Sequence, residues 1–143
     1  MAEYTLNAVQ EIAVNGSAIF NDSIPCNKGF IYHRNESGIF ILRGIVNNPT
    51  SCFGRYQLTF NGNIAIPTGQ EVTPISMAIS IGGEAIQTSN AIVTPAEVDN
   101  YFNITSTAFI DVPKNCCFSI AVENTSTIPV NLQNANLVIM RVA

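Results

Sequence analysis

The 143-residue sequence has no tryptophan and a single histidine, and charged residues make up only 11% of it. Globular proteins usually carry roughly 25% charged residues, so the charged fraction here is unusually small. Without tryptophan, and with only four scattered tyrosines, the chain lacks the aromatic platform that would mark a lectin. Apolar residues nevertheless make up 47% of the sequence, and this content combined with low charge argues against a disordered chain.

Positive charge is also scarce. The sequence has only six lysines and arginines, no two of them are adjacent, and the formal net charge is −4. A chain without a basic stripe cannot hold a row of phosphates, so we expect no nucleic-acid partner. The same scarcity argues against a membrane surface, and the longest apolar runs are far too short to span a bilayer. The first ten residues show neither a basic segment nor an apolar leader, which predicts cytoplasmic synthesis without general secretory export.

The sequence also lacks the motifs of common enzyme classes. It contains no G-x-S-x-G elbow, no H-E-x-x-H pair and no glycine loop for a phosphate. A nucleophile that needs an imidazole would have to use His33, which Arg34 and Glu36 follow in a predicted polar turn. We therefore predict that the protein is not an enzyme and has no catalytic residue, no cofactor and no metal site.

Two adjacent cysteines are the strongest candidates for metal or redox chemistry. In a strand, neighbouring side chains point to opposite faces, so Cys116 and Cys117 cannot readily chelate one ion. Cys116 would share the apolar face with Phe118 and Ile120, and it is predicted to be a small core residue. Free thiols are the expected state, and a disulfide or metal cluster involving loop cysteines stays open as an alternative. The four cysteines are Cys26, Cys52, Cys116 and Cys117.

Short runs of alternating or β-branched residues, separated by Asn, Gly and Pro, dominate the sequence and predict strands. No linker and no repeat interrupts them, so residues 1–143 are expected to form one domain. About ten strands at this spacing predict an all-β antiparallel sandwich or jelly roll. The expected strands cover residues 9–14, 17–21, 29–33, 38–45, 54–66, 75–81, 84–93, 101–112, 117–124 and 134–142.

One segment predicts a helical turn between two strands. Thr94 is a candidate N-cap, Pro95 stands at the first helical position, and Glu97 completes a capping box. The carboxylates of Glu97 and Asp99 are expected to serve the cap and a solvated turn rather than catalysis.

Three of the predicted strands differ in how their two faces are used. Residues 75–81 alternate Ile and Met with Ser and Ala, which predicts one core face and one polar face. Residues 39–42 and 137–140 are apolar on both faces, so each needs a second covering layer, which a neighbouring subunit could supply. The alternative is that the chain's own loops cover them. The predicted self-association residues are Ile39, Phe40, Ile41, Leu42, Leu137, Val138, Ile139, Met140 and Val142.

The later segments follow a recognisable order. The first motif is a G-x-Y strand with Gly54, Tyr56, Leu58 and Phe60. The second is a tight turn at Gly82 and Gly83 before Glu84, and the third is a turn at Pro113–Asn115 between two apolar strands. This order resembles the tumour-necrosis-factor-like jelly roll, a superfamily that includes the globular head of complement subcomponent q. The sequence departs from the family at Leu58, where an aromatic is common, and at 113–115, where a Gly–Asp pair is missing. The resemblance covers roughly residues 19–143.

The resemblance implies a ten-stranded jelly roll, a tight homotrimer around an apolar axis, and a role in binding or display rather than catalysis. The Asn- and Thr-rich, charge-poor texture is similar to bacterial and phage-borne relatives. We therefore predict a non-enzymatic protein on a particle surface, most specifically a phage virion component that decorates a capsid, forms a head fibre or binds a receptor. Residues 1–10 would then be an anchoring arm on the particle.

An alternative prediction is a module of a bacterial cell or spore surface that binds a carbohydrate or another receptor. In both cases the expected partners are further copies of the chain and a surface, with a host glycan or receptor as a further candidate. The corresponding locations are the virion surface after cytoplasmic synthesis, or the bacterial cell or spore surface.

Overall fold

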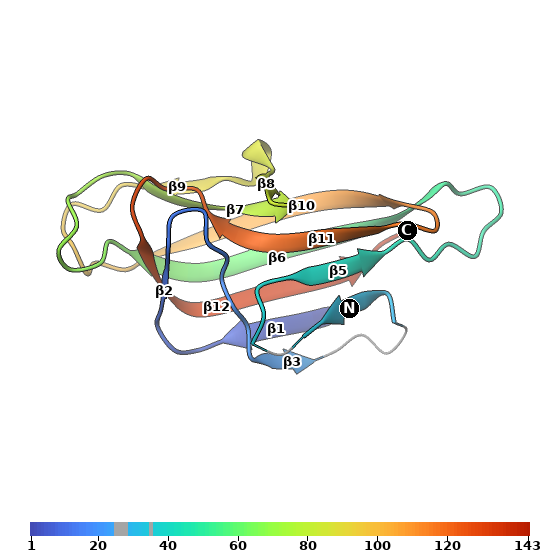
Figure 1. The fold of residues 1–143 in the computed structure, drawn as a ribbon, viewed down its shortest axis with the longest axis horizontal. Coiled ribbons are helices and arrows are strands. Elements are labelled where there is room, and N and C mark those ends of the chain that lie inside the picture. Colours follow the sequence, from blue (N-terminus) through green and yellow to red (C-terminus); the bar gives the residue numbers. More distant parts are fainter. Residues whose placement is uncertain (25–28, 35) are drawn as a thin grey trace.

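The structure, a computed structural model, describes residues 1–24, 29–34 and 36–143. In these residues two antiparallel sheets stack face to face as a sandwich (Figure 1). The first sheet has six strands in the order β10-β6-β12-β1-β3, with β2 also paired to β12. Its strands are β1 (Ala2–Leu6), β2 (Gln10–Ile12), β3 (Asp22–Ile24), β6 (Phe53–Ala65), β10 (Phe102–Pro113) and β12 (Val130–Arg141).

The second sheet also has six strands, in the order β4-β5-β11-β7-β8, with β9 also paired to β7. A 3₁₀ turn, η1 (Gln87–Ser89), precedes β9 and lies at the edge between the sheets. There Ser106 of β10 donates a hydrogen bond to the Ser89 carbonyl, and the Ile79 amide donates to the Ser89 hydroxyl over 2.9 Å. The strands of this sheet are β4 (Ile31–His33), β5 (Phe40–Arg43), β7 (Ile75–Ile81), β8 (Glu84–Ala85), β9 (Ala91–Val93) and β11 (Cys117–Asn124).

Alternation along the long strands decides which side chains enter the core. In β10, every second residue from Ile104 to Val112 is buried, and the residues between them are exposed. β12 keeps the same alternation after a register shift between Gln133 and Asn136, where Asn134 has a positive φ of 56°. The strands expected at 75–81 and 117–124 have the predicted bounds. The strand expected at 17–21 is wrong, because only isolated bridges form there, at Ser17 and Phe20. The other expected strands are found with shifted ends or divided into shorter pieces.

The core contains a cluster of rings contributed by both sheets. The Phe40 ring centroid lies 4.6 Å from that of Tyr4, 4.2 Å from that of His33 and 5.5 Å from that of Phe20. The His33 Nε2 also lies 2.9 Å from the Ser37 carbonyl oxygen. The single histidine therefore packs as an aromatic residue at the end of β4, stacked on Phe40 and edge-on to Tyr4, and ring contacts of these kinds stabilise a core.

The predicted anchoring arm at residues 1–10 is wrong, because its first half is a strand inside the first sheet. β1 pairs with β12 on one side and with β3 on the other. Its inward residues Ala2, Tyr4 and Leu6 are all buried. A segment that fills the middle of a sheet cannot also reach out to a particle.

The helical turn predicted at Thr94 is also wrong. Residues 94–101 contain only bends and a turn, in which Asp99 adopts a positive φ of 59°. The Asp99 amide donates to the Ile66 carbonyl over 2.9 Å, and its carboxylate accepts a bond from Thr68 over 2.6 Å. These contacts tie the segment to the end of β6, so the local capping pattern does not produce a helix.

β7 has no solvated polar face, contrary to the prediction from its alternation. Six of its seven residues are buried, including Ser76 and Ser80. The Ser76 hydroxyl lies 2.6 Å from that of Thr125, and the Ser80 hydroxyl donates to the Ala121 carbonyl over 3.3 Å. Because each serine has a partner inside the fold, β7 can be covered on both faces.

Cys116 is not in the core, and that prediction is wrong too. β11 begins only at Cys117, and Cys116 lies exposed in the turn that joins β10 to β11. There the Cys116 amide donates to the Pro113 carbonyl, and its carbonyl accepts from the Gly44 amide over 2.8 Å. Cys52, Cys116 and Cys117 are free and exposed, as expected for their redox state, whereas Cys26 lies outside the described residues.

A buried asparagine attaches the segment after β2 to the end of β11. Asn124 is fully buried, and its amide nitrogen lies within 3.3 Å of the carbonyl oxygens of Ile12, Ala13 and Ile128. Its side-chain oxygen accepts a bond from the Ser126 amide over 2.9 Å. One side chain thus holds three stretches of backbone together.

Replacement of Asn124 by alanine is expected to cost about 2–3 kcal/mol, because it leaves buried carbonyl groups without a donor. The matched control is Asn136→Ala, which removes one half-exposed bond to Glu3 and should cost about 0.5–1.5 kcal/mol. Urea unfolding followed by circular dichroism measures both. Equal losses in the two variants would show that Asn124 does not hold the segments together.

Candidate self-association face

The outward side of the first sheet is a broad surface made by the three longest strands of the fold. β10, β6 and β12 lie side by side with β6 in the middle, and each contains twelve or thirteen residues (Figure 1). Alternation places Gln57 and Thr59 of β6 on this side, opposite the buried Tyr56, Leu58 and Phe60. We call this surface the first-sheet face.

Apolar side chains gather at one end of the first-sheet face. Phe109 of β10 and Met140 of β12 both pair with Gln57, so they flank it in one row across the sheet. Their side chains are 63% and 37% exposed, which is unusual for residues of this size in an ordered strand. In the next row Thr59 separates Thr107 from the half-buried Val138.

Amide and hydroxyl groups occupy the other end of the face. The Asn103 amide donates to the side-chain oxygens of Asn61 and Asn63 over 2.8 and 3.2 Å. Thr105 donates to Asn61 over 3.2 Å, and Asn136 donates to the Glu3 carboxylate over 3.0 Å. Apart from the Glu3 carboxylate these groups are neutral, and they bond to one another, so covering this end would desolvate few unpaired polar atoms.

One ion pair lies beside the apolar end. Arg55 donates two hydrogen bonds, of 2.8 and 3.1 Å, to the Asp111 carboxylate. The guanidinium carbon of Arg55 lies 5.2 Å from the centre of the Phe53 ring. The hydrogen bond from Arg55, together with its charge, lowers the pKa of Asp111 below its ordinary value. Both side chains are almost half exposed, so the pair stabilises the fold little but keeps its charges neutralised at this border.

The residues predicted for self-association are divided between the two sheets. Phe40, Leu42, Leu137 and Ile139 are completely buried in the chain's own core, so they are corrected from interface residues to core residues. Val138 and Met140 lie on the first-sheet face, and Val142 is exposed just beyond β12. Ile41 and the exposed Ile39 belong to β5 and its approach, in the second sheet. The predicted residues therefore do not form one surface.

The residues predicted for self-association did not include Phe109, although it is the most exposed apolar residue of the row described above. The run "STAFIDV" alternates Ser106, Ala108 and Ile110 on one face with Thr107 and Phe109 on the other. An aromatic residue on the polar side of an alternating strand is a detectable signal. This signal is easily overlooked, because Phe109 lies between the apolar residues Ala108 and Ile110 and the three together read as one apolar run.

The described residues show no arrangement suited to metal chemistry. Within residues 1–24, 29–34 and 36–143 no three His, Cys, Asp or Glu side chains lie close enough together to hold an ion. No helix in the same part of the chain has the length and apolarity of a membrane span.

Comparison with solved structures identifies the fold. The chain is similar to the globular domain of a zebrafish complement 1qA protein, with a TM-score of 0.68 and 11% identity over 99% of this chain and 97% of that one. It is also similar to the Eiger tumour necrosis factor of S. frugiperda, with a TM-score of 0.67 and 11% identity over 100% and 92% of the two chains. Murine APRIL gives a TM-score of 0.64 and 11% identity over 99% and 98%.

The protein therefore has the tumour-necrosis-factor-like and complement-q-like jelly-roll fold, which confirms the predicted fold class and the predicted resemblance. No protein-family model matches the sequence. No curated protein matches it either.

Proposed function

We propose that the protein is a non-enzymatic display module that assembles as a homotrimer through its first-sheet face and is carried on the surface of a particle. The observation that carries this proposal is the exposed apolar row of Phe109 and Met140 across three long strands. Covering the exposed part of the Phe109 side chain is worth about 1–2 kcal/mol, so this row favours a covered state.

The composition of the face supports association with identical copies. The polar residues of β6, β10 and β12 on this face are mostly Asn, Thr and Gln, and their described charges there are the neutralised Arg55–Asp111 pair. Three carboxylates lie toward the margin of the face, namely Glu3, which is bonded to Asn136, Glu11 of β2 and Asp22 of β3. Identical surfaces that meet around an axis place like charges near one another, so a contact centred on the three long strands avoids that repulsion. Proteins with this fold are typically trimers, which makes three the expected number of copies.

A phage virion is the proposed setting. Decoration proteins and fibres are packed as many copies on one particle, and a chain with 11% charged residues and a net charge of −4 accumulates little repulsion in such an array. The proposed roles are capsid decoration, head fibre or receptor-binding tip, after cytoplasmic synthesis. Because β1 is part of the sheet, attachment to the particle would use a surface other than residues 1–6.

The experiment that tests this proposal has two parts. Light scattering of the purified protein should give a mass three times the 15.4 kDa of one chain. An antiserum against the protein should then label particles by immunoelectron microscopy in a lysate of the cells that produce it. A monomer in the first measurement would overturn the trimer, and labelling of whole cells or spores instead of particles would overturn the virion.

A further inference from the structure

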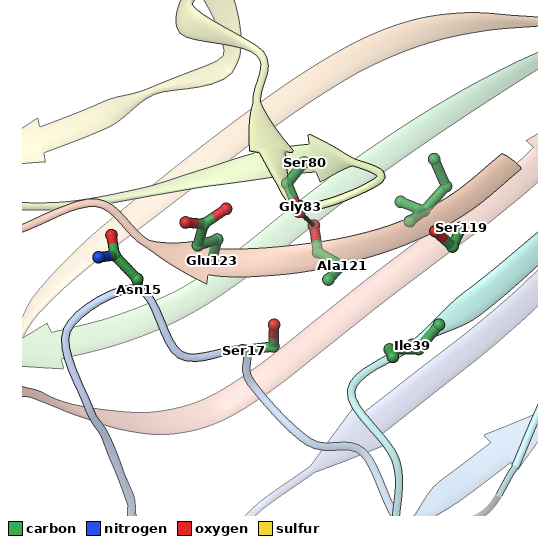
Figure 2. A pocket seen from close by; sticks show the side chains of 9 residues that line it. Asn15, Ser17, Ile39, Ser80, Gly83, Ser119, Ala121 and Glu123 are labelled. Carbon is green, nitrogen blue, oxygen red and sulfur yellow. Dashed lines mark hydrogen bonds between the residues drawn. The ribbon is translucent and has the colours of Figure 1, made fainter.

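A small cavity opens on the outward side of the second sheet, away from the first-sheet face. Its volume is about 130 Å³, and β11 forms its floor (Figure 2). The segment 15–18 continues along β11 where β5 has not yet begun, because the Ala18 amide donates to the Val122 carbonyl and the Asn15 amide to the Asn124 carbonyl. Ile39 closes the same side, and Ser80 and Gly83 of β7 and its turn close the other.

The two ends of this cavity differ in chemistry. Asn15 and Glu123 lie toward one end and are neighbours in the view of Figure 2, while Ser17 stands apart from both and points toward β11. Asn15 has a positive φ of 62°, a conformation that asparagine tolerates better than most residues. Ile39 and Ala121 supply apolar surface toward the other end, together with the hydroxyl group of Ser119.

Among the residues that the structure describes, Glu123 is the only titratable one that lines the cavity. Burial raises the pKa of its carboxyl group above the ordinary value, because partial removal of water disfavours the charged form. The residues directly opposite it, Ala78 and Ser17, carry no charge. Arg43, the cation of β5, pairs with Cys117 at the far end of β11 and bonds to the Gly29 carbonyl. The described part of the chain thus brings no cation to this carboxylate.

We propose that this cavity binds a primary alkylammonium group, with its nitrogen against the Glu123 carboxylate and its alkyl stem along Ala121 toward Ile39. An ammonium group has three N–H donors and no acceptor. The Glu123 carboxylate accepts from these donors, and Asn15 and Ser17 line the same cavity as neutral polar groups. A charge-assisted bond to a carboxylate is among the stronger hydrogen bonds of proteins.

The position of the cavity keeps it open in the proposed trimer. It lies on the second sheet, and the first-sheet face lies on the opposite side of the sandwich. The ammonium group could belong to a small free amine or to a lysine side chain of a partner protein. Both sources present the same chemistry, and the choice of ligands in the test separates them.

The test is a titration of the isotope-labelled protein followed by the backbone amide signals of Ala121 and Glu123. n-Butylammonium should cause saturable shifts at these positions, and n-butanol at the same concentrations should not. Nα-acetyl-lysine methylamide represents the protein-borne source, so binding at least as tight as that of n-butylammonium would assign a lysine partner, and binding of the free amine alone would assign a small amine. Equal shifts with n-butanol or with methyl glucoside would overturn the proposal.

Glu123→Gln provides the decisive variant, because it removes the charge and keeps the shape. We expect at least a tenfold loss of n-butylammonium affinity, with unchanged or slightly higher thermal stability because a dehydrated charge is removed. The matched control is Glu84→Gln, an exposed carboxylate on neighbouring β8 that does not line the cavity and should leave affinity unchanged. Wild-type affinity in the folded Glu123→Gln protein would overturn the proposal.

The affinity should also depend on pH in a defined direction. Only the ionised carboxylate attracts the cation, so affinity is constant between the raised pKa of Glu123 and the pKa of the amine, about 10.4, and falls as the pH drops through the carboxyl pKa. Bound amine favours the ionised form and should therefore move the carboxyl pKa back down. The wild-type protein is compared with Glu123→Gln, whose residual affinity should be flat over the same range.

Discussion

A chain that lacks residues 1–10 is expected not to fold. β1 lies between β12 and β3, so its removal breaks two strand pairings in the interior of the first sheet. It also removes the buried side chains of Ala2, Tyr4 and Leu6. Because a domain is stable by only about 5–15 kcal/mol, the loss of an interior strand and its core residues exceeds what the rest of the sheet can offset. Circular dichroism and limited proteolysis measure the outcome directly.

Two point variants test whether the effect of the deletion comes from the buried residues of β1 or from the rest of residues 1–10. Tyr4→Ala should destabilise the protein by about 3–5 kcal/mol, since Tyr4 is buried and its ring packs against those of Phe40 and His33. Val9→Ser, at a side chain that is 51% exposed, should change stability by less than about 0.5 kcal/mol. A folded deletion protein with native melting temperature would restore the anchoring arm and contradict the placement of β1.

The strands were predictable because alternation is local information. Residues 75–81 and 117–124 have clean patterns bounded by Gly, Pro or Asn, and the structure gives them the predicted bounds. β1 was missed because "AEYTL" places polar Glu3 and Thr5 between its core residues in a segment that also resembles an arm. Its pairing partner, β12, is more than 120 residues away along the chain, and no local pattern records that contact.

For several strands, the sequence did not predict correctly which face would be buried and which would be exposed. Residues 40–42 of β5 and 137–140 of β12 are apolar on both faces, yet one face of each is core and the other is only partly covered. β7 was expected to be half solvated, yet its serines are buried because partners from distant segments satisfy them. Long-range pairing decides each of these outcomes, so the same alternation can produce a core face, a buried polar face or an exposed apolar face.

The amine cavity could not be predicted from the sequence for a related reason. Its lining comes from segments 15–17, 39, 80–83 and 119–123, which only the second sheet brings together. In the sequence "AVEN", Glu123 has the pattern of an ordinary outward charge when the strand is considered alone. Its distinctive property, a partly dehydrated carboxylate without a nearby cation, exists only after segment 15–18 has taken its place along β11.

Phe109→Glu is expected to convert the proposed trimer into a folded monomer. The side chain is 63% exposed in the single chain, so the change removes little of the chain's own packing. In the trimer it would remove about 1–2 kcal/mol of apolar burial from every copy and place a carboxylate at a water-poor contact. Light scattering at several protein concentrations should give the 15.4 kDa of one chain, and circular dichroism should show an unchanged sheet.

Ile92→Glu is the matched control for this variant. Ile92 of β9 is 64% exposed, almost the same as Phe109, but it pairs with Ser76 in the second sheet and lies away from the first-sheet face. A new charge there should leave the trimer intact, so the two variants together distinguish one specific face from general hydrophobic association. If Ile92→Glu instead dissociates the trimer and Phe109→Glu does not, the contact lies on the second sheet. In that case the amine cavity would be close to the interface, and its affinity for n-butylammonium would have to differ between trimer and monomer.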